Sequence, residues 1–498
     1  MYLLGFDIGS SSVKASLIEG ASGKLIADAF SPETEMKIIA KHPDWAEQNP
    51  ELWWENVKLA TAKIISKAAI NIDEIKAIGI TYQMHGLVLV DKNYSVLRDA
   101  IIWCDSRASE IGRKAFASIG EEKCLEHFLN SPGNFTASKL RWVRENEPEV
   151  YERIYKFMLP GDYIAMKMSG TIQTTISGLS EMILWDYKKN DVADILLQHY
   201  DISKDLIPEI VPTFSIQSEL NVSAAKELGL KSGTKITYRS GDQPNNAFSL
   251  NVLNPGEVAT NAGTSGVIYG VTEEAKTDSK SRVNPFVHVN NSNENPRYGI
   301  LLCINGTGIL NNWLKEFLSI TGDISYQKMN ELAAQSPPGA QGLKFYPFGN
   351  GAERIFEDKN IGASLKDFHF NIHNPSYILR AAQEGIVFAL NYGLDIMRAM
   401  EVKPKVIRAG ETNMFLSPVF RQTFATLTGV VVELYDTDGS EGAARGAAVG
   451  FGFYSNFNEA FQNLKQTKAI EPDENLSQVY QDAYNNWLNH LNKILDAD

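Results

Sequence analysis

The first thirty residues alternate short apolar runs with turns of small residues. Residues 2–8 form an apolar run, residues 9–12 read Gly-Ser-Ser-Ser, and residues 13–18 alternate apolar and polar side chains. A second turn at 21–24 precedes another apolar run that starts at about Leu25. Apolar runs of this length separated by glycine and serine predict three strands joined by two tight turns.

A long helix and a buried strand are predicted next. Residues 51–69 place their apolar side chains at helical spacing, which indicates an amphipathic helix. Residues 75–81 are almost wholly apolar and lead into the loop at 82–86. Strand-like and helix-like segments continue to alternate along the chain, which is typical of the α/β class.

The opening pattern recurs near the middle of the chain. Residues 257–271 again read as a short apolar strand, a turn of glycine, threonine and serine, and a second strand. Either the fold is duplicated or this is an ordinary hairpin with small residues in its turn, and the pattern alone leaves both interpretations open. Asn254-Pro255-Gly256 lies between the two units, so we expect a domain boundary at about residue 250.

The length of 498 residues also predicts at least two large domains. Residues 276–298 are rich in asparagine, serine and lysine, and we expect them to form an exposed excursion. The C-terminal 45 residues are predicted to be helical.

Composition narrows the possible functions. The 44% of hydrophobic residues is typical of globular proteins, and we expect neither a membrane span nor a signal peptide. The net charge of −13 argues against a nucleic-acid partner but leaves nucleotides possible. The three cysteines show no CxxC spacing, which fits a reducing cytoplasm and neither a disulfide scaffold nor a zinc site.

Common catalytic motifs are absent, and glycine-rich turns beside acidic residues remain. The sequence has no GxxxxGK[ST], HExxH, GxSxG or dinucleotide fingerprint. Asp7 ends an apolar strand and is followed by Ser10, Ser11 and Ser12, a pattern that suits a metal–phosphate group or a simple Asx turn.

Three further turns allow a similar choice. Asp242 in Gly241-Asp242-Gln243 is a candidate general base or an ordinary turn residue. Residues 261–266 could cradle a second phosphate, and residues 409–413 could admit a flat base or cap a helix.

Two loops offer candidates for binding a polar substrate. His85 follows a buried strand, where a lone histidine is more often structural than functional. Trp103 precedes Cys104-Asp105-Ser106-Arg107, and it could face a sugar or pack under an ion pair.

Taken in order, these motifs resemble the FGGY family of carbohydrate kinases over about residues 3–452. The most specific match is HPDWAEQNPELWW, since no general physical rule produces that segment. Gln83-Met84-His85-Gly86 and Trp103-Cys104-Asp105-Ser106-Arg107 resemble the sugar loops of xylulokinases within the family. The remaining matches are GFDIGSSSVKASLIE at the N-terminus, residues 241–243, residues 261–266 and the small-residue segment 441–448, which resembles one late in the second domain.

The resemblance implies an α/β fold of two actin-like ATPase (ribonuclease H-like) domains with an interdomain cleft. The expected domains are 1–250 for sugar and phosphate, 251–455 for the nucleotide, and a helical extension at 456–498. The implied reaction is transfer of a phosphoryl group from ATP, with Mg²⁺, to a sugar hydroxyl, most closely D-xylulose to D-xylulose 5-phosphate. The expected partners are therefore a small sugar and ATP, with a homodimer possible.

Residue roles carry over by motif. The resemblance makes Asp242 the general base and Asp7 a catalytic residue and metal ligand. The residues expected to bind the sugar are Met84, His85, Asp105 and Gln243. Those expected to bind the nucleotide are Ser10, Ser11, Ser12, Gly263, Thr264, Ser265, Gly410 and Asn413.

Three positions depart from the xylulokinase pattern. Cys104 and Gln243 each stand where asparagine is usual, and residues 408–416 are closer to the glycerol-kinase version of the adenine segment. The alternatives are therefore a kinase for another polyol or keto-sugar, such as glycerol, L-ribulose, fuculose or gluconate, or a non-catalytic sugar sensor on the same fold. The sugar-loop resemblances argue against an ATP-driven clamp or chaperone.

Overall fold

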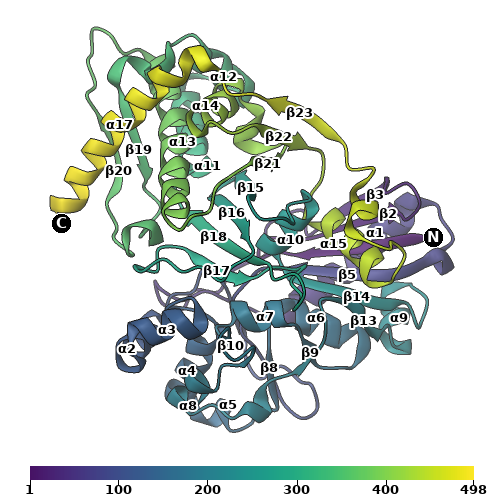
Figure 1. Ribbon diagram of the computed structural model, residues 1–498. Helices are drawn as coiled ribbons and strands as arrows, with labels where there is room; N and C mark the ends of the chain where they lie inside the picture. The colour runs from purple at the N-terminus through teal and green to yellow at the C-terminus, as the bar shows by residue number, and fades with distance from the viewer. Residues whose placement is uncertain (498) are drawn as a thin grey trace. The chain divides into compact units, whose positions relative to one another are not determined.

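The computed structural model describes residues 1–497, which divide into two compact units (Figure 1). Unit 1 comprises residues 1–251, 286–298 and 437–464, and unit 2 comprises the remainder. The chain thus leaves unit 1 at residue 251 and returns to it twice. This division differs from the continuous segments 251–455 and 456–498 expected from the sequence, because packing joins segments that are far apart along the chain.

Unit 1 is built on a six-stranded sheet. In spatial order the strands are β13 (Phe214–Glu219), β14 (Lys235–Gly241), β5 (Ile75–Tyr82), β1 (Tyr2–Ile8), β2 (Val13–Glu19) and β3 (Leu25–Ser31). Strands β1, β2 and β3 form an antiparallel meander, and β1 also pairs parallel with β5. Strand β14 pairs parallel with β5 on the other side, and the edge strand β13 pairs antiparallel with β14.

Helix α1 (Pro50–Ala68) packs against β2 and β3. It begins at Asn49, whose side chain accepts a 3.0 Å hydrogen bond from the Glu51 amide, with Pro50 in the first helical position. Both features favour helix initiation. The structure therefore confirms the predicted strands, turns and first helix.

Helix α15 (Gly439–Gly450) packs against the same sheet at very short range. A Cβ at Gly5 of β1 would lie 2.0 Å from the Ser440 carbonyl oxygen, and one at Gly79 of β5 would lie 2.0 Å from the Ala443 carbonyl oxygen. Only glycine permits this approach. The segment 441–448, predicted late in the second domain, therefore belongs to unit 1, and the start of α15 lies beside β1.

The other elements of unit 1 surround this sheet. Its remaining helices are α2 (Ser109–Ile119), α3 (Glu121–Phe128), α4 (Thr136–Asn146), α5 (Pro148–Tyr151), α6 (Pro160–Ser169), α7 (Ile176–Glu181), α8 (Asp194–Tyr200), α9 (Val222–Leu228), α10 (Asp242–Ser249) and α16 (Phe457–Phe461). Its two- and three-residue strands are β4 (Glu47–Gln48), β6 (Val88–Val90), β7 (Ala100–Ile101), β8 (Lys156–Met158), β9 (Gln173–Thr174), β10 (Trp185–Asp186), β11 (Asp191–Val192) and β12 (Glu209–Ile210).

Unit 2 repeats the arrangement of the unit 1 sheet. A hairpin supplies the central strand, two parallel strands follow beside it, and an antiparallel strand comes last. The repeated pattern in the sequence therefore corresponds to a repeated strand order. That order is β18 (Tyr298–Ile304), β16 (Gly266–Thr272), β15 (Glu257–Ala262), β21 (Val406–Gly410), β22 (Val432–Tyr435) and β23 (Gln466–Ile470).

The core of unit 2 contains the long helix α13 (Pro375–Ala399) and the C-terminal helix α17 (Glu474–Ala497). Trp487 of α17 is fully buried, stacks on Tyr346 with 5.0 Å between ring centroids, and donates from Nε1 to the Phe345 carbonyl. The other elements are α11 (Gly308–Leu318), α12 (Tyr326–Ala334), α14 (Pro418–Thr428), β19 (Lys344–Phe348) and β20 (Gly362–Lys366).

Two local expectations are wrong. The C-terminal 45 residues are not helical throughout, because β23 pairs with β22 at the sheet edge. The segment 276–298 is not simply exposed, because it contains β17 (Asn284–Val287) and the fully buried Phe286. Val287 exchanges 3.1 Å hydrogen bonds with Ser177 and Ser180 of α7.

Candidate functional site

The carboxyl ends of three neighbouring parallel strands bring the unit 1 candidates together. β1 lies beside β5 with Asp7 opposite Thr81, and β14 lies beside β5 with Gly241 opposite Tyr82. Asp7, the loop after Tyr82 and Asp242 therefore share one edge of the sheet. This edge is where open α/β sheets generally bind ligands.

Asp7 lies against the first turn of α15. A Cβ added at Gly439 would be 2.7 Å from the Asp7 Oδ2 atom, so glycine leaves room for the carboxylate. Burial raises the pKa of Asp7 to about 6, the nearby Lys14 opposes this rise, and Asp438 adds to it. Asp438 caps α15, since its side chain accepts a 3.0 Å hydrogen bond from the first-turn amide of Glu441.

Asp242 is the first residue of α10 and follows β14 directly. Burial, helped by the negative charge of Asp7, raises the pKa of Asp242 to about 7, although hydrogen bonds from Gln243 oppose the change. A carboxyl group that titrates near neutrality is suited to accept a proton. Gln243 thus contacts the carboxyl group of the candidate base.

The loop at 83–86 is held by buried groups. His85 has a left-handed backbone with φ of 60°, which is uncommon outside glycine. Its amide donates to Glu181 Oε2 at 3.0 Å, and Tyr82 donates to Glu181 Oε1 at 2.9 Å. Met84 lies against Gly241, where an added Cβ would be 2.6 Å from Met84 Cγ. The loop is thus fixed directly beside Asp242.

Asp105 has a different environment from the one expected. It is fully buried, and both of its oxygens accept hydrogen bonds from Arg107, while Oδ2 also accepts one from the Ala46 amide at 2.6 Å. The Arg107 guanidinium lies 3.9 Å from the Trp45 ring centroid. This geometry favours a supporting role for Asp105. Trp103, which is 49% exposed, is an accessible aromatic side chain in this segment.

The turn at Ser10–Ser12 joins β1 to β2 and is braced from outside. Trp103 donates from Nε1 to Ser10 Oγ at 3.3 Å, and Gln48 donates from its amide to the Ser10 carbonyl at 2.7 Å. Within the turn, the Gly9 amide donates to the Ser12 carbonyl, and the Ser11 carbonyl accepts from the Met36 amide. The tryptophan-rich motif around Gln48 therefore holds the predicted phosphate turn in place.

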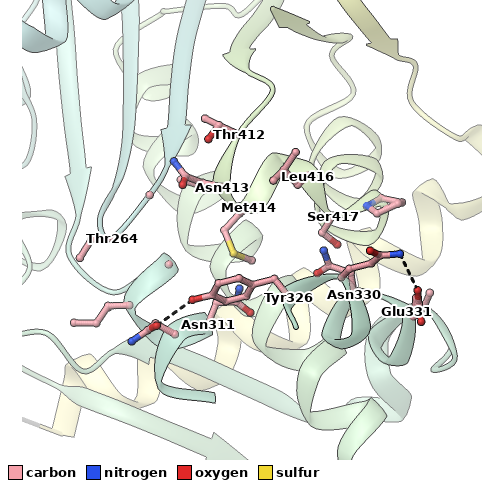
Figure 2. A pocket seen from close by; sticks show the side chains of 18 residues that line it. Thr264, Asn311, Tyr326, Asn330, Glu331, Thr412, Asn413, Met414, Leu416 and Ser417 are labelled. Carbon is pink, nitrogen blue, oxygen red and sulfur yellow. Dashed lines mark hydrogen bonds between the residues drawn. The ribbon is translucent and has the colours of Figure 1, made fainter. Parts of the chain in front are cut away.

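Unit 2 contains a cavity of about 900 Å³ at the corresponding edge of its sheet. Figure 2 shows Thr264, Asn413 and Met414 around it, together with Tyr326 and Asn330 of α12. The cavity is large enough for a nucleotide. The structure thus brings Gly263, Thr264 and Asn413 together around one space.

Two predicted nucleotide residues do not line this cavity. Ser265 lies in the turn after Thr264 but is absent from the lining, and so is Gly410. Gly410 ends β21, and its carbonyl accepts a 2.8 Å hydrogen bond from the Thr412 amide. Gly410 thereby shapes the turn that presents Asn413, whose backbone is left-handed with φ of 52°.

Sequence reasoning missed Gln48, Lys139 and Glu181 as supporting residues of the site. Gln48 lies in the segment HPDWAEQNPELWW that resembles the family, but nothing in the sequence indicated its structural role. Lys139 and Glu181 were not marked, because each contacts a loop that lies more than fifty residues away along the chain.

The carboxylates of unit 1 fit a hard divalent cation. Asp7 lies within electrostatic range of both Asp242 and Asp438. Mg²⁺ favours one or two such carboxylates and takes its other oxygen ligands from phosphate and water. Among residues 1–497 there is no cluster of three or more histidine, cysteine, aspartate or glutamate side chains with metal-binding geometry.

The repeated sheets, each with a glycine-rich hairpin turn, define the fold as that of the two-domain sugar kinases. The N-terminal domain of the FGGY family of carbohydrate kinases matches residues 2–249, and the C-terminal domain of that family matches residues 258–452. The chain belongs to the FGGY family of carbohydrate kinases, whose members use ATP.

Individual relatives agree with this assignment. The chain is 30% identical to the xylulose kinase of Escherichia coli over 90% of this chain and 89% of that protein. It superposes on the xylulose kinase of Rhodospirillum rubrum with a TM-score of 0.88 at 24% identity, covering 99% of each chain. It also superposes on a gluconate kinase from Lactobacillus acidophilus with a TM-score of 0.90 at 23% identity, covering 99% of this chain and 98% of that one. The fold is therefore shared by kinases named for different sugars.

In the part of the chain that the structure describes, we find no helix both long and apolar enough to cross a membrane.

Proposed function

We propose that this carbohydrate kinase transfers the γ-phosphoryl group of ATP to D-xylulose, giving D-xylulose 5-phosphate and ADP. The observation that carries the proposal is the position of Asp242, whose pKa is raised to about 7, beside the loop of Met84 and His85. The 30% identity with a relative named xylulose kinase supports the choice of sugar.

Asp242 acts as the general base in this proposal. Its carboxylate accepts the proton of the attacking sugar hydroxyl while the hydroxyl oxygen forms a bond to the γ-phosphorus. The bond between that phosphorus and the β,γ-bridging oxygen breaks, and ADP leaves. Met84, His85 and Gln243 orient the sugar, since phosphoryl transfer depends mainly on positioning and charge neutralisation.

The nucleotide binds in the unit 2 cavity. Backbone amides at Gly263 and Thr264 face phosphate oxygens, and Asn413 contacts the nucleoside. In unit 1, the turn at Ser10–Ser12 offers further amides for the transferred phosphate. Asp7 would hold Mg²⁺, which supplies charge neutralisation for the phosphates when bound.

A substrate panel tests the proposal. The purified chain is assayed with Mg-ATP by coupled ADP release against D-xylulose, L-ribulose, fuculose, gluconate and glycerol, with Asp242→Asn as the inactive control. We expect the highest kcat/KM with D-xylulose. A higher kcat/KM for another sugar would replace D-xylulose with that sugar, and sugar binding without ADP release from any of them would indicate a sensor.

A further inference from the structure

A buried lysine connects the two loops that carry the sugar-site predictions. Lys139 of α4 is 0% exposed. Its Nζ donates to the His85 carbonyl at 2.9 Å and to the Ile102 carbonyl at 3.0 Å. His85 belongs to the loop beside Asp242, and Ile102 immediately precedes Trp103. One ammonium group therefore links the two loops, next to the backbone bridge between Leu87 and Ile101.

His85 is held at both ends of its backbone. Its carbonyl accepts from Lys139, and its amide donates to the buried carboxyl group of Glu181 at 3.0 Å. A left-handed backbone at a residue other than glycine is energetically unfavourable and persists only where the surroundings hold it. Lys139 and Glu181 supply that restraint, and neither is needed to contact the sugar.

We propose that Lys139 is a positioning residue that sets the spacing of the two sugar loops, so that sugar affinity depends on its positive charge. This inference rests on the proposed function, because it takes these loops as the sugar site. Charge-assisted hydrogen bonds are about twice as strong as neutral ones. Loss of the charge would therefore loosen both loops without altering the nucleotide cavity of unit 2.

The surroundings of Lys139 bring the loss of its positive charge close to neutral pH. Burial lowers the pKa of Lys139 to about 8. The amine is therefore charged below about pH 8 and neutral above it. The groups that face it are Asp105, Cys104 and Glu181, which raise its pKa, and Arg107, which lowers it.

Lys139→Met tests the proposal, because methionine fills a similar buried volume without charge or donor. Lys156→Met is the matched control. Lys156 also donates to two carbonyls, those of Asp205 and Ile207 at 2.6 and 2.7 Å, but it braces a different segment. For both variants, the KM values for sugar and for ATP and the kcat are measured from pH 6.5 to 9.5.

We expect the wild-type KM for sugar to rise above about pH 8 while the KM for ATP stays nearly constant. Lys139→Met should raise the sugar KM about tenfold at pH 7, which corresponds to losing about 1.4 kcal/mol of binding. In this variant the sugar KM should no longer rise at alkaline pH. Lys156→Met should behave as the wild type. An unchanged sugar KM in Lys139→Met, or an equal rise in the KM for ATP, would overturn the proposal.

Two further measurements test the role of Lys139 if the variant does not fold or if no sugar is phosphorylated. If Lys139→Met does not fold, a wild-type sugar KM that is constant from pH 7 to 9.5 overturns it. If no sugar is phosphorylated, the proposed function fails, and amide hydrogen exchange then tests the brace itself. Exchange at 83–86 and 102–105 should be faster in Lys139→Met than in Lys156→Met, and equal rates would refute the brace.

Discussion

The side-chain amide of Gln48 donates a 2.7 Å hydrogen bond to the backbone carbonyl of Ser10, in the turn that follows Asp7. The other end of the Gln48 amide accepts a 3.1 Å hydrogen bond from Trp53 Nε1 on helix α1. This chain of contacts gives a physical reason for the tryptophan-rich motif. The motif anchors the turn at Ser10–Ser12 to the buried Trp53 side chain of α1.

Gln48→Leu should weaken the use of ATP more than the binding of sugar. The substitution removes both hydrogen bonds at a buried position, and each contributes about 0.5–1.5 kcal/mol. We expect kcat/KM for ATP to fall about tenfold, with a smaller change in the sugar dissociation constant measured by calorimetry. Asn146→Ala, which removes only a hydrogen bond within α4, is the control. Equal losses for sugar and nucleotide would show that Gln48 supports the fold generally.

Asp242→Asn should lower kcat by about 10²–10⁴-fold, which is the usual contribution of a general base. In the wild type, kcat/KM for sugar should rise with pH through about 7, because Asp242 accepts a proton only when ionised. Initial rates from pH 5.5 to 8 test both expectations. An Asp242→Asn rate within tenfold of the wild type would contradict the assignment.

The same substitution should stabilise the free protein at alkaline pH. The pKa of Asp242 is about 7 in the folded chain against an ordinary value of 3.8. Its ionised form therefore destabilises the folded state above pH 7, and this cost disappears as the pH falls toward 4. Asp242→Asn should have a higher Tm than the wild type at pH 8, by about 2–4 °C for each kcal/mol relieved, and a similar Tm near pH 4. A lower Tm at pH 8 would contradict the burial argument.

Glu181→Gln and Glu181→Leu should have very different KM values for the sugar. Burial raises the pKa of Glu181 well above its ordinary range, which favours a neutral carboxyl group that glutamine can replace. Leucine removes the acceptors for the His85 amide and the Tyr82 hydroxyl. We expect a sugar KM within about threefold of the wild type for glutamine and at least about tenfold higher for leucine. Steady-state kinetics at pH 7 test this, and a large effect of glutamine would mean that the carboxyl group is ionised.

Local patterns predicted much of each sheet. The spacing of apolar residues located β1, β2 and α1, whereas the recurring hairpin at β15 and β16 left a repeated fold as one of two interpretations. These predictions succeeded because strand and helix periodicity depend on near neighbours. They failed at β23, whose short run of residues becomes a strand only because β22 offers it a partner.

The candidate site was also predicted only in part from the sequence. The sequence singled out Asp7 at the end of an apolar strand and Asp242 in a turn that resembles a family motif, and the structure brings both to one edge of a parallel sheet. The sequence predicts that Asp105 binds the sugar but does not show that Arg107 and the Ala46 amide donate to its oxygens.

The sequence by itself determined the family, the class of reaction and the strand ends that carry the acidic residues. Tertiary structure alone decided that α15 returns to unit 1 and that Lys139 and Glu181 hold His85. The physical reason is that glycine contacts, buried charges and their hydrogen bonds join residues far apart along the chain. Their strength depends on burial and distance, which only the folded chain creates.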